Sequence, residues 1–404
     1  MIKVCIAIFL TNLTLFLQAQ DVQSISEKPI DEALLDIERL VGKQIKDGTK
    51  VFGIGEVATF ARETQRFNTA LAAYLIGKQG FSAVLLEEDD WKVRELNGYL
   101  ASKDILDTLV IDSLVRFGLS VPNLRTGEFK EFIIWIKKYN LSNPDAIVGV
   151  YGVSANSSIP VDYLVNNYVT TIDYEATPKL AERWFKNHYS ESEAYQHVED
   201  WINSIDASTM TSEVAQLIGK YRKDINHNKM VLKPNSQDLK FSVSDFDRFE
   251  TYVVDQVLEK SKDKAILYSS NSRIMKGNFQ SKSVIDNPVL PTLGKNLHIK
   301  LKGNYSAFLT DFSGSAQLPI ADIEAQKISV EDISGSERAR NLALKGDRFF
   351  LPKDIKDIKE FIPASISFFK GRDVTLVLDE QLNPVDAIFL FSNLTDAEVL
   401  SNLD

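Results

Sequence analysis

The sequence predicts an α/β protein with three layers, in which a mixed, mostly parallel sheet is covered by helices on both faces. Two features predict this class. Short runs that are apolar at every position, typical of strands buried on both faces, alternate with longer segments whose apolar residues recur at helical spacing. The strand signal also stops between about 160 and 262, which indicates a helical insertion. The expected strands are 51–55, 83–86, 146–151, 265–268, 305–312, 374–378 and 387–391.

Helical segments separate the expected strands in the first half of the chain. Apolar residues recur every three or four positions in each of them. Glycines follow the first two, with Gly48 in a turn after the first and Gly80 at the end of the second. The segments are 31–46, 67–76, 91–100 and 128–139.

The helical insertion is expected to interrupt one continuous domain. Residues such as Trp184, Tyr195 and Trp201 keep helical spacing through it. Because strands are expected on both sides of the insertion, we expect both halves to build one sheet. The polar tract 314–348 is expected to be a long surface excursion. We therefore expect one α/β domain over 21–404, with its insertion at about 160–262.

The first twenty residues predict export. Lys3 is the only charge before an apolar run from Val4 to Leu17, and Ala19 follows as a small residue at the expected cut. This run is shorter than the ~20 residues of a bilayer span. Residues 1–20 are therefore interpreted as a signal peptide, and the mature protein as periplasmic or extracellular without a stable membrane anchor. A retained anchor is the alternative.

The composition argues against several classes of function. The formal net charge is −10, and no basic run with interleaved aromatic residues is present, so a nucleic-acid partner is not expected. The only cysteine, Cys5, lies in the expected signal peptide, which excludes disulfides and thiol chemistry after cleavage.

Familiar catalytic motifs are also missing from the sequence. It has no Gly-x-Ser-x-Gly elbow, His-Glu-x-x-His zinc helix or phosphate-binding Gly-x-x-x-x-Gly-Lys loop. The histidines lack zinc-ligand spacing and are expected to have surface or structural roles, and no metal or other cofactor is expected. They are His188, His197, His227 and His298.

Polar residues follow several of the expected strands. In sheets of this kind ligands bind at the carboxyl ends of the strands, so these residues are candidates for a polar cleft. The alternative is the ordinary polarity of loops that follow buried strands. The candidates are Glu56, Thr59 and Arg62 after the first strand, Glu87 after the second, and Ser270 and Arg273 after the fourth.

Several of these segments also form an ordered set of motifs. Residues 55–63 read Gly-Glu-Val-Ala-Thr-Phe-Ala-Arg-Glu, residues 80–87 end a strand in glutamate, and residues 135–140 read Trp-Ile-Lys-Lys-Tyr-Asn. Residues 268–273 read Tyr-Ser-Ser-Asn-Ser-Arg, and further landmarks lie at 150–152, 293–297 and 384–388. In this order and at these intervals, the segments resemble the erythromycin-esterase-like family along nearly the whole mature chain.

The resemblance implies an ester hydrolase that works without a metal, through a histidine that is held by a glutamate and activates water. Histidine suits this role because it exchanges protons near neutral pH. The glutamates are retained as Glu56 and Glu87, and the signature arginine as Arg62. Thr59 stands in place of the base histidine, and Ser270 and Arg273 stand where the family has two more histidines.

Two functions therefore stay open, besides a structural or protein-interaction role. The first is a catalytically degenerate member that binds a small molecule in the hydrolase cleft. The second is an active exported hydrolase of carboxylic esters, including macrolide-type lactones, with Glu87 or Glu56 as the base. We expect Glu56, Thr59, Glu87, Ser270 and Arg273 to line one pocket, with Arg273 paired to one of the two glutamates.

Overall fold

The computed structural model describes most of the chain from residue 25 to residue 400. The expected signal peptide and Thr59 lie outside the described residues. The residues left out are 1–24, 59, 155–158, 188–190, 207, 209, 213, 220, 223–241, 282–283, 314, 323–326, 335–347, 351–364, 368–372, 378–381 and 401–404.

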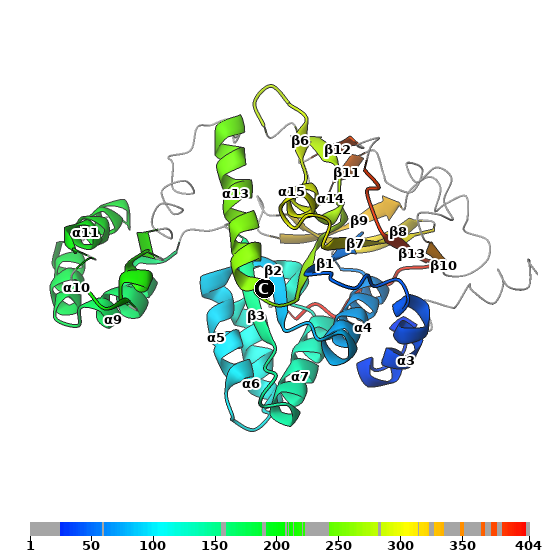
Figure 1. The fold of residues 1–404 in the computed structure, drawn as a ribbon, viewed down its shortest axis with the longest axis horizontal. Helices are drawn as coiled ribbons and strands as arrows, with labels where there is room; N and C mark the ends of the chain where they lie inside the picture. The colour runs from blue at the N-terminus through cyan, green and yellow to red at the C-terminus, as the bar shows by residue number, and fades with distance from the viewer. Residues whose placement is uncertain are drawn as a thin grey trace, which may run out of the picture. The chain divides into compact units, whose positions relative to one another are not determined.

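Strands from both halves of the chain form one central sheet (Figure 1). All its described neighbours pair in parallel except β10 and β13, which are antiparallel. The α/β class, with a mostly parallel mixed sheet, is therefore confirmed. In spatial order the described strands are β10 (Arg348–Phe350), β13 (Ala387–Phe391), β7 (Tyr305–Phe312), β1 (Val51–Glu56), β4 (Ala265–Ser270), β2 (Ala83–Asp89) and β3 (Gly149–Ser154).

Helices cover both faces of this sheet, as Figure 1 shows. Phe52, Leu86 and Tyr268 face one layer of helices, whereas Leu85 and Leu267 face the other. The alternation follows from the period of two in a strand. The first layer contains α3 (Ile30–Val41), α4 (Arg62–Gln79), α5 (Asp90–Ala101) and α7 (Gly127–Ser142), and the second contains α13 (Val243–Lys260), α14 (Asn271–Ile274) and α15 (Leu293–Lys300).

Glycines of β1 allow the second layer to pack closely. A Cβ added at Gly53 would lie 2.5 Å from the hydroxyl of Tyr305, and one at Gly55 would lie 2.3 Å from Oδ1 of Asn271. A side chain at either position would therefore force these neighbouring groups to shift. The alternating glycines are therefore explained by the approach of α14 and its neighbours to the sheet.

Smaller strands form sheets of their own among the described residues. One contains β11 (Ser365–Ser367), β12 (Asp373–Val377), β5 (Asn278–Ser281) and β6 (Leu290–Pro291). Another pairs β8 (Ser315–Asp322) with β9 (Lys327–Ser334) in an antiparallel ribbon. The ribbon lies in the polar tract 314–348, which was predicted from the sequence to be a long surface excursion.

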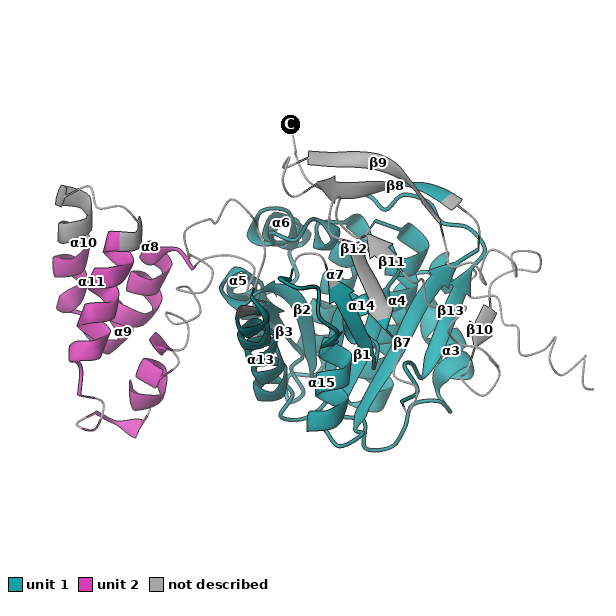
Figure 2. Ribbon diagram, turned by 90° about the horizontal axis from the view of Figure 1, so that it is seen from above, with its two compact units in different colours: residues 1–154, 240–404 teal, residues 155–239 magenta. Residues whose placement is uncertain are grey.

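The chain divides into two compact units, residues 1–154 with 240–404 and residues 155–239 (Figure 2). In the second unit, Tyr168 and Tyr221 pack with ring centroids 5.0 Å apart. Its described helices include α8 (Val161–Leu164), η3 (Val165–Val169), α9 (Thr170–Ile172), α10 (Ala176–Asn187) and α11 (Glu191–Ser204), and residues 214–219 and 221–222 are also helical. The predicted insertion extended to 262, but α13 packs on the sheet through Val253 and Val257. The assignment of 21–404 to one domain stays a prediction.

The motif at 135–140 connects α5 to the start of β3. Lys137 is fully buried, and its ammonium donates to the carbonyl oxygens of Tyr99 and Ser102 at 2.8 Å each, near the end of α5. The Asn140 side chain donates to the carbonyl of Leu100 and bonds both backbone groups of Val148. These contacts satisfy carbonyls that a helix end leaves unpaired, so the motif is structural.

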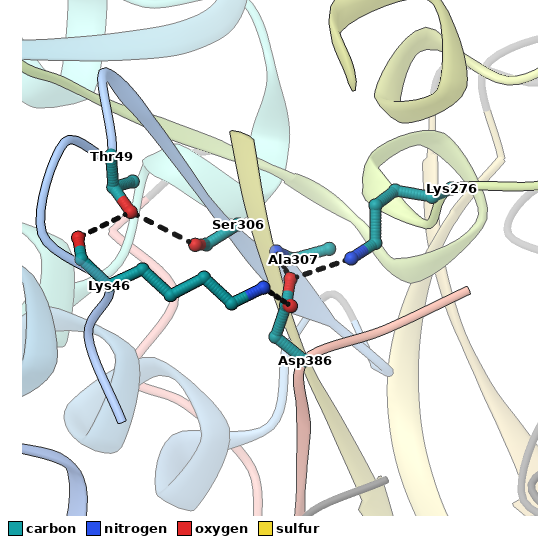
Figure 3. Close-up of polar contacts among 6 residues, drawn as sticks. All are labelled: Lys46, Thr49, Lys276, Ser306, Ala307 and Asp386. Atoms are coloured by element: carbon teal, nitrogen blue, oxygen red, sulfur yellow. Dashed lines mark hydrogen bonds and ion pairs between the residues drawn. The ribbon is translucent and has the colours of Figure 1, made fainter. Parts of the chain in front are cut away.

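Asp386 connects three distant parts of the first unit (Figure 3). Its carboxylate accepts 2.8 Å hydrogen bonds from the ammonium groups of Lys46 and Lys276 and from the backbone N–H of Ala307. These contacts outweigh burial and hold the pKa of Asp386 below its ordinary value. The landmark at 384–388 therefore also stabilises the fold.

In the described part of the chain, no helix is both long and apolar enough to cross a membrane.

Candidate functional site

Glu56 ends β1 at the carboxyl edge of the sheet. It is 5% exposed and is the Cα partner of Ser270 on β4. The side-chain amide of Asn123, which precedes α7, donates to Oε2 of Glu56 at 3.1 Å. Burial disfavours the anion more than Asn123 and Gln65 stabilise it, and the pKa of Glu56 rises from 4.5 to about 8. The carboxyl is therefore mostly protonated at neutral pH.

The surroundings of Glu56 are polar but contain few charges. Gln65 donates to the carbonyl of Asn123 and accepts from the hydroxyl of Thr126, and it is also one of the two amides that stabilise the Glu56 anion. The phenol of Tyr268 on β4 is also buried, and its pKa lies well above the usual range because of burial first and of the nearby Glu56 second. A neutral phenol and two amides thus flank this carboxyl.

Glu87 lies in a different cluster, which is held by Arg273. The Nε of Arg273 pairs with Oε1 of Glu87, and its Nη1 donates to Oε1 of Glu250 on α13 at 2.7 Å. The guanidinium carbon also lies 6.0 Å from the ring centroid of Phe249. One guanidinium therefore bridges a strand and a helix that are distant in the sequence.

Two opposing effects act on the ionisation of this cluster. Burial raises the pKa of Glu250, and the charge of Arg273 lowers it only in part. Burial alone would lower the pKa of Arg273, but its two carboxylate partners raise it above the usual value. The guanidinium therefore stays charged, as expected for a cation between two acids.

The two glutamates belong to opposite faces of the sheet. The side chain of Glu56 lies on the face of β1 that packs against α4 and the loop before α7. Gln65 and Asn123 lie on this face. Glu87 instead contacts Arg273 of α14, which packs with α13 on the other side. Both glutamates lie at the carboxyl edge, with β4 between their strands. Whether they line one pocket stays a prediction.

Other acidic residues at this edge stabilise loops. Glu88 accepts hydrogen bonds from the backbone N–H groups of Ser120 and Val121, the latter at 2.8 Å. Glu63 accepts from the backbone N–H and the hydroxyl of Thr395, at 2.7 and 2.6 Å. The interpretation as ordinary loop polarity therefore fits these two carboxylates better than a catalytic role.

The remaining candidates have local partners. The Arg62 guanidinium is half exposed, and its Nε lies 3.7 Å from Oε1 of Glu128. The hydroxyl of Ser270 lies 3.1 Å from that of Ser272. Thr59 lies outside the described residues. The structure thus brings Ser270 beside Glu56 and Arg273 to Glu87, and it pairs Arg62 with an acid that the sequence analysis did not consider.

Glu250 and Asn123 were not predicted from the sequence as residues of the site. Glu250 had a detectable signal, because Val253, Val254 and Val257 follow it on an apolar helical stripe and a charge there requires a partner. Asn123 lies in a short loop and had no such signal. No group of three or more described His, Cys, Asp or Glu side chains is arranged to hold a metal ion.

Fold and site together define a doubly covered α/β protein with a buried carboxyl and an arginine-bridged pair of acids at the carboxyl edge of its sheet. A model of the family "Erythromycin esterase" matches residues 76–282, a span that includes Glu87, Glu250 and Arg273. The chain belongs to this family, and the resemblance seen in the sequence is confirmed. Glu56 precedes the matched span. The comparison with curated proteins gives no match.

Three solved structures share the fold. A protein from Bacillus cereus is 14% identical with a TM-score of 0.64, covering 91% of this chain and 93% of its own. A succinoglycan biosynthesis protein is 18% identical with a TM-score of 0.65, covering 95% and 96%. A mutant of the erythromycin esterase EreC in its open conformation is 16% identical with a TM-score of 0.63, covering 91% and 95%. At these identities the likeness concerns the fold alone.

Proposed function

We propose that this protein is an exported member of the erythromycin esterase family that binds a small molecule at the carboxyl edge of its sheet and no longer hydrolyses esters through histidine. One observation carries the proposal. Arg273, which stands where the family has a histidine, is held between Glu87 and Glu250.

This arrangement opposes catalysis by Glu87. The carboxylate of Glu87 is already paired with the guanidinium of Arg273, so it is not free to bind and orient a water molecule. Thr59 and Ser270 offer only hydroxyl groups, which do not bind a proton near neutral pH. Loss of a general base typically slows a reaction by about 10²–10⁴-fold. Binding requires none of these proton transfers.

The active hydrolase remains a second candidate because of Glu56. A carboxyl with a pKa of about 8 exchanges its proton near neutral pH, as a general acid or base must. In that case Glu56, and not Glu87, would replace the missing histidine. Ester hydrolysis would then change with pH around the pKa of Glu56, about 8.

Ester turnover by the purified mature protein separates the two candidates. We would measure hydrolysis of p-nitrophenyl butyrate and of erythromycin by the wild type, Glu56→Gln, Glu87→Gln and the control Asp112→Asn, whose carboxylate pairs with Lys130 on α7. Binding without turnover is expected. Turnover that is lost in Glu56→Gln but kept in the control would establish the hydrolase instead.

A gain-of-function series tests the loss of the catalyst from the other direction. Histidines introduced together at Thr59, Ser270 and Arg273 are expected to raise ester turnover above the background of the wild type. Arg273→His alone is the control, because it frees Glu87 without supplying the base at Thr59. No gain in the triple variant would argue against the proposal that missing histidines explain the missing turnover.

Export is part of the proposal and rests on residues 1–20. N-terminal sequencing of the protein from its natural host is expected to give a chain that begins near Gln20 or Asp21. Recovery of a membrane-bound chain that retains Met1 would contradict export by this route.

A further inference from the structure

The two carboxyl oxygens of Glu56 have different environments. Oε2 accepts the hydrogen bond from Asn123 at 3.1 Å. Oε1 is buried and has no hydrogen-bond partner among the described residues. A buried polar atom without a partner costs about 1–3 kcal/mol, so native proteins rarely retain one without a use.

Among the described residues, the side chains that lie beside Glu56 are uncharged. From α4 come Gln65 and Asn68, and from the loop before α7 comes Asn123. From β4 come Tyr268 and Ser270, whereas on β7 the Thr310 hydroxyl bonds the backbone of Gly55 and Val57. No cation is among the causes that shift the pKa of Glu56. This environment favours the neutral acid.

The position of the proton follows from the hydrogen bond at Oε2. Because Oε2 accepts from the Asn123 amide, the proton of the neutral acid belongs on Oε1. The atom that lacks a partner is thus a donor. Ser270, beside Glu56 on β4, is partly exposed, so solvent reaches the neighbouring strand at this edge.

We propose that Glu56 presents a carboxylic O–H at Oε1 that donates a hydrogen bond to a carbonyl oxygen of an uncharged ligand. This inference rests on the proposed function and specifies its ligand class. The ligand is expected to be uncharged, because both arginines among the predicted site residues already have acidic partners. Arg273 pairs with two carboxylates, and Arg62 pairs with Glu128. An anionic group would gain little from cations that are already neutralised.

The test is the pH dependence of binding, with erythronolide B as the probe because this macrolactone has carbonyl groups and no titrating group. If only the protonated form binds, the apparent Kd is the intrinsic Kd divided by the protonated fraction. With a pKa of about 8, the affinity measured by calorimetry should fall about tenfold between pH 6.5 and pH 9.0. Asp112→Asn should show the same fall.

Glu56→Gln is the decisive variant. The glutamine amide is a neutral donor at every pH, so its affinity should match that of the wild type at pH 6.5 within about threefold and stay constant to pH 9.0. Glu56→Leu has no donor and should bind weakly at both values. In infrared difference spectra of the free protein, a protonated-carboxyl C=O band should disappear between these pH values and be missing from Glu56→Gln.

The outcomes separate the inference from the proposed function. Binding of the probe with the same affinity at both pH values, or an infrared difference without the carboxyl band, would overturn the role of Glu56 and leave small-molecule binding intact. Absence of probe binding at both pH values would overturn the uncharged carbonyl ligand. If erythromycin also failed to bind, the binding function itself would be refuted.

Discussion

Replacing Glu56 by glutamine is expected to stabilise the folded protein by an amount that grows with pH. The pKa of Glu56 rises from 4.5 to about 8 on burial, so between these values the folded protein holds a proton that the unfolded chain has lost. The free energy of unfolding of the wild type therefore falls as the pH rises through this window. Glutamine has nearly the same shape and does not titrate, so the free energy of unfolding of the variant does not fall in this way.

The magnitude follows from about 1.4 kcal/mol for each pKa unit. On this scale titration of Glu56 lowers the stability of the wild type, relative to the variant, by about 2 kcal/mol at pH 6 and by about 4.7 kcal/mol at pH 9. The increase of about 2.7 kcal/mol between the two pH values is the informative quantity, because differences in hydrogen bonding by glutamine affect both measurements alike.

Urea unfolding of both proteins at pH 6 and pH 9 measures this increase directly. Asp112→Asn is the matched control, because the ion pairs of Asp112 lower its pKa from 3.8 and its charge is constant over this range. Its stability difference from the wild type should not change between the two pH values. A gap between wild type and Glu56→Gln that is equally independent of pH would refute the argument that burial keeps Glu56 protonated.

Three further substitutions test the polar contacts, each by urea unfolding. Arg273→Met should destabilise the protein by about 3 kcal/mol, because it leaves two carboxylates without their cation. Lys137→Met should cost about 2 kcal/mol by removing the donor to two buried carbonyls, whereas Lys138→Met, at an exposed neighbour, should change little. Asp386→Asn should cost about 3–5 kcal/mol, because Lys276 is buried beside it.

Each of these three has an outcome that would contradict it. Adding Glu250→Gln should recover part of the loss in Arg273→Met, and a further loss would mean that the arginine does not act through that acid. Equal effects at Lys137 and Lys138 would exclude the helix-end role of Lys137. The contribution of Asp386 should be present above pH 3.8 and disappear as the pH falls through its lowered pKa, so a gap that widened in acid would exclude the ion pairs as its origin.

The layered fold could be predicted because its signals are local. Runs such as 83–86 are apolar at every position, and such a pattern is typical of a strand that helices cover on both faces. The end of the insertion was harder to place, since α13 has the same helical spacing as the helices before it. Only its packing, through Val253 and Val257 on the sheet, groups it with the first unit.

By itself the sequence determined the α/β class, the family, the retained Glu56 and Glu87, and the absence of histidine at 59, 270 and 273. The tertiary structure decided what surrounds each of these groups. In the folded chain Glu87 pairs with the guanidinium of Arg273, whereas Glu56 lies beside neutral amides on the opposite face of the sheet. Burial and pairing are properties of the surrounding volume, which residues distant in the chain fill, and local spacing contains no information about them.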